Sequence, residues 1–127
     1  MAERIMPKVA LIEDDAVMLS LLQMLLEYEG FETVQLDGMG KVDNIVDILR
    51  QARPDLILMD VHLRQINGLD LLRELRIDPS LQAVKILISS GMELSSESSM
   101  EGADGFILKP YMPDDLVARI REALGAV

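Results

Sequence analysis

Five short apolar runs alternate with segments of helical periodicity along this chain, and this alternation constrains the fold more than any other feature. Nearly continuous apolar runs are typical of strands buried on both faces of a parallel sheet, with the connecting helices covering those faces. The candidate strands are KVALIE (8–13), FETVQL (31–36), DLILMD (55–60), VKILIS (84–89) and GFILK (105–109). The pattern predicts an α/β fold of five βα units, a doubly wound three-layer sandwich around a five-stranded parallel sheet.

The segments between and after these strands predict the helices. The candidates are 16–28, 42–53, 69–76 and 113–124, with a short, weaker helix inside the serine-rich segment 91–104. Pro54 requires the second helix to end before it, and Pro113 suits the first turn of the last one. The first helix carries one apolar stripe that we expect to face the core, made of Met18, Leu21, Leu22, Leu25 and Leu26.

Size and composition limit the class of protein. The 127 residues, half of them hydrophobic, fit one domain spanning 1–127. A formal charge of −10 argues against nucleic-acid binding through this domain. The chain has no cysteine, which excludes disulfides and thiolate zinc sites. No secretory signal precedes the first strand and no apolar run is long enough to cross a membrane, so we expect a soluble, cytoplasmic protein.

Polar residues gather at the carboxyl ends of the predicted strands, where ligands bind in doubly wound sheets. They are Glu13, Asp14, Asp15, Asp60, Ser89, Ser90 and Lys109. Taken singly, each also has a purely structural explanation, such as a helix cap, a turn acid or a surface lysine. Their convergence on one edge of the sheet indicates a single ligand site instead.

The chemistry of that site follows from its charges. Carboxylates with one lysine and one hydroxyl suit a hard cation, and Mg²⁺ binds one or two carboxylates while leaving positions to water and phosphate oxygens. Two metal-binding acids, Asp60, Mg²⁺ and Lys109 together carry no net charge. If Asp60 attacks a phosphorus atom, the metal and the lysine hold the incoming charge of roughly −2. The balance predicts an aspartyl-phosphate site with Mg²⁺ as its cofactor.

Five motifs, in this order and spacing, make the chain similar to the receiver domain of two-component response regulators over essentially its whole length. They are LIEDD, DLILMDVHLRQINGLDLL, ILISSG, GADGFILKP and PDDLVARIREAL. The resemblance, which is to chemotaxis-regulator-like receivers, implies a flavodoxin-like sheet with strand order 2-1-3-4-5. It further implies a signalling phosphoprotein that takes its phosphoryl group from a sensor histidine kinase or a phosphotransfer protein and acts on a downstream effector. Such a chain catalyses only its own phosphorylation and dephosphorylation.

The resemblance also implies roles for single residues. Asp60 is the phosphoacceptor. Lys109 binds the phosphoryl group, and its peptide bond to Pro110 is expected to be cis. Gly68 is the turn glycine of the family. His62 offers Mg²⁺ its main-chain carbonyl oxygen, although as the sole histidine its imidazole also leaves open a catalytic base or a phosphohistidine.

The switch of the family is a hydroxyl at the end of the fourth strand. Receivers place a small residue after this hydroxyl, which aligns it with Ser90 before Gly91, and Ser89 stays as the alternative. In the family an aromatic ring on the fifth strand rotates inward behind the hydroxyl, and Phe106 holds that position. Phe106 is equally consistent with a permanently buried strand residue. The responding face comprises 91–104, 105–109 and 113–124. Whether the chain forms a homodimer through this face is an open alternative.

The three consecutive acids divide into two roles. In receivers the spacing from the directly ligating acid to the glycine after the first helix is nearly constant, and Asp14 and Gly30 are sixteen residues apart. On this register Asp14 binds the metal directly and Glu13 binds it through water. Asp15 then caps the first helix. A shift by one residue would make Asp14 and Asp15 the metal pair, and this alternative stays open.

Three departures from the family pattern stand out. Arg64 replaces the proline usually found four residues after the acceptor, which we expect to alter the loop beside the site. Leu19 replaces a basic residue of the first helix. The connection from Ser90 to Lys109 is a few residues short, which puts the usual docking surface there in doubt.

Other functions fit these residues less well. A haloacid-dehalogenase-type phosphatase needs a second acid where His62 stands, and a flavin binder needs a phosphate-cradling loop where Glu13, Asp14 and Asp15 would repel the ligand. A degenerate receiver that only docks other proteins is the main alternative, but such proteins usually lack one of the site residues. Whether the chain is a stand-alone regulator or part of a longer protein stays open.

Overall fold

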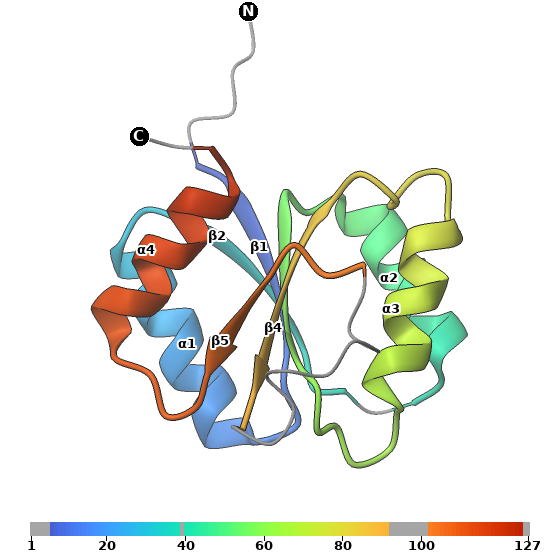
Figure 1. The fold of residues 1–127 in the computed structure, drawn as a ribbon, viewed down its shortest axis with the longest axis horizontal. Coiled ribbons are helices and arrows are strands. Elements are labelled where there is room, and N and C mark those ends of the chain that lie inside the picture. Colours follow the sequence, from blue (N-terminus) through green and yellow to red (C-terminus); the bar gives the residue numbers. More distant parts are fainter. Residues whose placement is uncertain (1–5, 39, 92–101, 126–127) are drawn as a thin grey trace, which may run out of the picture.

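The computed structural model describes residues 6–38, 40–91 and 102–125. The elements follow in the order β1 (Lys8–Ile12), α1 (Ala16–Tyr28), β2 (Glu32–Leu36), α2 (Val42–Ala52), β3 (Leu56–Asp60), α3 (Gly68–Ile77), β4 (Lys85–Ser90), β5 (Gly105–Leu108) and α4 (Pro113–Ala123). The five strands form one parallel sheet in the order β2-β1-β3-β4-β5 (Figure 1). The predicted doubly wound fold and its strand order are therefore confirmed.

Helices cover both faces of the sheet. Figure 1 shows α1 and α4 on one side and α2 and α3 on the other, with the strands between them. Alternate strand residues point to opposite faces, so that Leu11, Leu58 and Leu87 pack with α1 and α4. Ile12, Ile57 and Ile88 pack with α2 and α3. As predicted for strands buried on both faces, every residue of β3 and every residue of β4 after Lys85 is buried.

Where a predicted end of a helix or strand differs from the observed end, the difference is one residue. The second helix ends at Ala52, because Arg53 adopts a left-handed backbone conformation with φ 53° ahead of Pro54. The predicted helix within 91–104 falls largely on residues 92–101, outside the described residues.

One packing prediction for α1 is wrong. Leu21 was expected on the buried stripe, but its side chain is 56% exposed, whereas Leu22 and Leu26 are buried. Successive residues of a helix are separated by about 100°, which turns Leu21 to the side of that stripe. The core-facing surface of α1 is therefore narrower than the run of leucines suggested.

Candidate functional site

The candidate site lies at the carboxyl ends of β1 and β3. The strand order reverses between these two strands, because the chain passes from β1 to β2 on one side and then to β3 on the other. Such a switch point is where doubly wound sheets bind ligands. Asp60 is the last residue of β3, and Glu13 follows β1, where its N–H donates to the Leu36 carbonyl at 3.1 Å.

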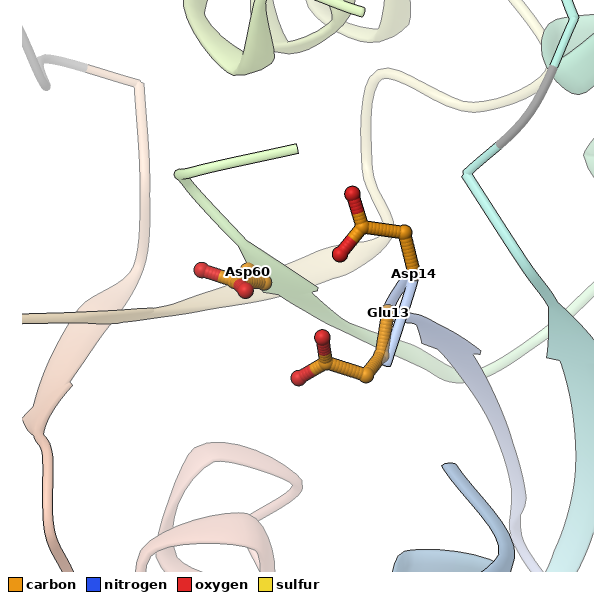
Figure 2. Close-up of side chains that lie close together, drawn as sticks. All are labelled: Glu13, Asp14 and Asp60. Carbon is orange, nitrogen blue, oxygen red and sulfur yellow. The ribbon is translucent and has the colours of Figure 1, made fainter. Parts of the chain in front are cut away.

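Three carboxylates converge at this point. Glu13, Asp14 and Asp60 each bring one oxygen within 4.8 Å of the others, and Figure 2 shows their side chains gathered around a common space. Glu13 and Asp60 are buried. Burial raises the pKa of Glu13 and the charge of Asp60 adds to the rise, against the Asp15 N–H and Lys109, which lower it. A buried group of carboxylate oxygens is the donor set that hard cations prefer.

Lys109 supplies positive charge to two carboxylates of this cluster. Its Nζ lies 3.0 Å from Asp60 Oδ2 and 3.7 Å from Glu13 Oε1. The Lys109 N–H donates to the Ser90 carbonyl at 2.8 Å, which fixes the lysine just beyond the end of β5. The peptide bond to Pro110 is cis, as the resemblance implied.

The loop after β3 closes over Asp60. The His62 N–H donates to Asp60 Oδ1 at 3.0 Å, so this carboxylate is held from both sides, by the loop on Oδ1 and by Lys109 on Oδ2. Gly68 begins α3 at the far end of the same loop, and a Cβ there would approach the Val61 carbonyl oxygen to 3.0 Å. Glycine therefore allows α3 to start directly against the loop that holds Asp60.

Arg64 contacts Asp14 from the same loop. Its N–H donates to Asp14 Oδ2 at 2.7 Å, its Nε reaches the same oxygen at 3.2 Å, and its Nη2 donates to the Asp14 carbonyl at 3.0 Å. Burial alone would raise the pKa of Asp14, but the backbone and guanidinium donors of Arg64 outweigh it and lower that pKa. Asp14 is thus held in its charged form.

Asp15 does not belong to this cluster and caps α1. Its Oδ1 accepts the N–H groups of Val17 at 3.0 Å and Met18 at 3.1 Å, which are free donors of the first helical turn. The Asp15 N–H donates to Glu13 Oε2 at 3.1 Å. The third acid therefore caps the helix and helps to position the first acid.

The two serines at the end of β4 differ in surroundings. Ser89 pairs with Asp60 across β3 and β4, and both serines are buried. The Ser90 Oγ has no hydrogen-bond partner among the described residues. The strand alternation turns Ser90 to the α2 and α3 face, against which Phe106 also packs from β5, where it pairs with Ile88.

Two contributions to the site were not foreseen from the sequence. Arg64 was noted as a departure, but its bonds to Asp14 were not, because the two residues are fifty positions apart. Tyr111 was missed altogether. Burial, together with the charges of Glu13 and Asp60, raises the pKa of Tyr111 to about 12. Its place two residues after Lys109 was the only signal that could have indicated it.

No helix within the described part of the chain has both the length and the apolar character needed to cross a membrane.

Solved structures share this architecture. A CheY-like receiver domain protein from Methanospirillum hungatei superposes with a TM-score of 0.80 at 26% identity, covering 94% of each chain. TrrA from Thermotoga maritima, solved in complex with Mg²⁺ and BeF, gives a TM-score of 0.81 at 21% identity, covering 93% of this chain and 99% of TrrA. At the latter identity the likeness concerns the fold alone.

Sequence comparisons extend the likeness beyond the fold. The DNA-binding response regulator MtrA of Mycobacterium tuberculosis is 35% identical over 120 residues, covering 92% of this chain and 50% of MtrA. The transcriptional regulatory protein CpxR of Escherichia coli is 38% identical over 121 residues, covering 94% of this chain and 50% of CpxR. The chain thus spans about half the length of these curated relatives. The family model of the response regulator receiver domain matches residues 9–121. The chain therefore belongs to the receiver domains of two-component response regulators.

Proposed function

We propose that this chain is a phosphorylation-dependent signalling receiver in which Asp60 accepts a phosphoryl group. The main support is the environment of Asp60, the last residue of the central strand β3. Lys109 Nζ lies 3.0 Å from one oxygen of its carboxylate, and the Glu13 and Asp14 carboxylates lie beside it. A carboxylate nucleophile, a fixed cation and a pair of further acids are the parts that an aspartyl-phosphate site needs.

The donor set fits Mg²⁺. The three carboxylates carry more negative charge than Lys109 and Arg64 together neutralise, and oxygen ligands of this kind suit a hard divalent cation. Asp14 is the proposed direct ligand and Glu13 a ligand through water. Asp60 and the His62 main-chain carbonyl oxygen are the other two proposed protein ligands. When bound, Mg²⁺ neutralises charge on the phosphoryl oxygens.

The proposed donor is a phosphohistidine of a sensor kinase or a phosphotransfer protein. An Asp60 carboxylate oxygen attacks the phosphorus in line, the P–N bond breaks, and its electron pair returns to the imidazole ring of the donor. Lys109, already on Asp60 Oδ2, pairs with the phosphoryl oxygens after the transfer. Attack by water later releases inorganic phosphate and restores the carboxylate. The chain catalyses these two steps on itself.

The proposed readout begins at Ser90. Its hydroxyl is buried and has no hydrogen-bond partner within 6–38, 40–91 and 102–125, which favours Ser90 over Ser89 as the group that turns toward the phosphoryl oxygens. Phe106, half-buried on the same face of the sheet, is the aromatic residue proposed to move behind it. This movement would present β5 and α4 to a downstream effector or to a second copy of the chain.

The proposed partners are proteins of a cytoplasmic signalling pathway. MtrA is named as DNA-binding, but this chain spans about half of MtrA and carries a formal charge of −10. We therefore assign no nucleic-acid contact to this domain. Residues 1–127 are proposed to act as one receiver domain, whatever output it serves.

Acetyl phosphate tests the function directly. The protein is incubated with this small donor, with and without Mg²⁺, and its intact mass is measured. We expect one added phosphoryl group that depends on Mg²⁺ and is absent from Asp60→Asn. Asp70→Asn is the matched control, because it makes the same chemical change at an exposed position of α3.

Two outcomes would contradict the proposal. Equal labelling of Asp60→Asn would mean that another residue accepts the phosphoryl group. No labelling of the unaltered chain would favour a receiver that docks proteins without phosphorylation.

A further inference from the structure

Arg64 hydrogen-bonds to Asp14 through two chemically different donors, its backbone N–H and its guanidinium. The backbone N–H is neutral and makes the shorter bond, 2.7 Å to Oδ2, whereas the guanidinium brings a full positive charge to the same oxygen at 3.2 Å through Nε. The guanidinium also bonds the Asp14 carbonyl at 3.0 Å through Nη2. One carboxylate of the acidic cluster is therefore already paired with a cation from the chain.

The two partners of this ion pair differ in exposure. The Asp14 side chain is 7% exposed and the Arg64 side chain is 74% exposed. A solvated guanidinium leaves at little cost, because water replaces its bonds. We therefore take the effect of an exposed charge, about 1.4- to 5-fold in an equilibrium constant, as the scale for the Arg64 guanidinium. Asp14 stays in place when this happens, because the backbone N–H of Arg64 still holds it.

We propose that Arg64 is a tethered cation that competes with a divalent metal for Asp14 and thereby lowers the Mg²⁺ affinity of the site. The inference rests on the metal site of the proposed function. Both cations draw on the charge of one carboxylate, and a guanidinium on Oδ2 repels a divalent ion approaching that carboxylate. Arg64 thus sets the Mg²⁺ concentration at which the receiver becomes competent for phosphorylation.

The opposite effect is the main physical alternative. Groups that hydrogen-bond a metal ligand often strengthen metal binding, because they orient that ligand. Here the orienting bond is the one from the backbone, which every residue other than proline would supply at position 64. The guanidinium adds charge where orientation is already provided, so its net effect on metal binding is unfavourable.

Isothermal titration of the full chain with MgCl₂ tests the competition. Arg64→Ala and Arg64→Gln both remove the charge and keep the backbone N–H, so we expect the Kd for Mg²⁺ to fall about 2- to 5-fold in each. Arg64→Lys keeps a charge and should stay close to the unaltered chain. Arg73→Ala is the matched control, because it deletes an equally exposed arginine from the ion pair with Asp70.

The outcomes separate this inference from the function on which it rests. Tighter Mg²⁺ binding in both neutral variants, unchanged in Arg73→Ala, supports the competition. Equal or weaker binding in the neutral variants overturns it while leaving the metal site intact, and so does equal tightening in Arg73→Ala, which would reflect net charge alone. Absence of Mg²⁺ binding in every variant overturns both.

Discussion

Substitution of Asp15 tests how the three consecutive acids after β1 divide their roles. The Asp15 Oδ1 accepts two N–H groups of α1, and the first turn of that helix contains no other acidic residue. Losing such a cap costs about 0.5–2 kcal/mol, with a centre near 1. We therefore expect Asp15→Ala to lower the free energy of unfolding by about 1 kcal/mol. Asp15→Asn keeps the acceptor and loses only the charge at the helix end, about 0.3–1 kcal/mol.

Two measurements on the same variants give the answer. Urea unfolding reports the free energy of unfolding, and calorimetric titration reports the Kd for Mg²⁺. Glu13 belongs to the cluster within 4.8 Å and Asp15 does not. Glu13→Gln should therefore weaken Mg²⁺ binding strongly, whereas Asp15→Asn should change the Kd by no more than about twofold, as expected of a screened surface charge.

The opposite pattern would refute this division of roles. If Asp15→Asn weakened Mg²⁺ binding as much as Glu13→Gln does, Asp14 and Asp15 would be the metal pair. If Asp15→Ala left the free energy of unfolding unchanged, the two bonds to Val17 and Met18 would not be a stabilising cap.

Three further predictions follow from the packing and charges of the site. Gly68→Ala should lower the free energy of unfolding by about 1–3 kcal/mol in urea titrations, because its Cβ would lie 3.0 Å from the Val61 carbonyl oxygen; an unchanged midpoint would show that the loop yields easily. Lys109→Ala should still bind Mg²⁺ in calorimetry, but its phosphorylated form should bind the effector poorly, because it lacks the ammonium group that lies 3.0 Å from Asp60 Oδ2. Unchanged effector binding would contradict this. Burial raises the pKa of Glu13 above its ordinary value of 4.5, so the folded state binds this proton more tightly than the unfolded state does. The contribution of Glu13 to stability is therefore lost as the pH rises from 4.5 through the pKa of the folded state. Glu13→Gln should therefore raise the free energy of unfolding at neutral pH, with a gain that shrinks as the pH approaches 4.5 from above; a gain independent of pH would show that charge is not the cause.

The elements were predictable because burial has a local signature. The runs LILM in β3 and ILI in β4 are continuously apolar because both faces of the sheet are covered, and such a run has few other stable placements in water. Leu21 was misplaced because a helix rich in leucine does not reveal the edge of its buried stripe. That edge depends on which residues of β2 and α4 lie opposite α1, which is a property of the assembled layers.

The sequence by itself determined that polar side chains stand at the carboxyl ends of buried strands. Asp60 had to lie at the sheet edge because the apolar run that precedes it has to be buried. The same reasoning indicated that Glu13 and Lys109 lie near it, since parallel strands end at one edge.

Only the tertiary structure decided which of these residues meet. The parallel register of β1 with β3 and of β4 with β5 sets Glu13, Lys109 and Asp60 within ion-pair distance, and a shift of one residue in either pairing would turn them to opposite faces. Arg64 reaches Asp14 across fifty positions because the loop after β3 folds back over the end of β1. Contacts of this kind depend on strand register and loop path, which the burial pattern of a single segment does not encode.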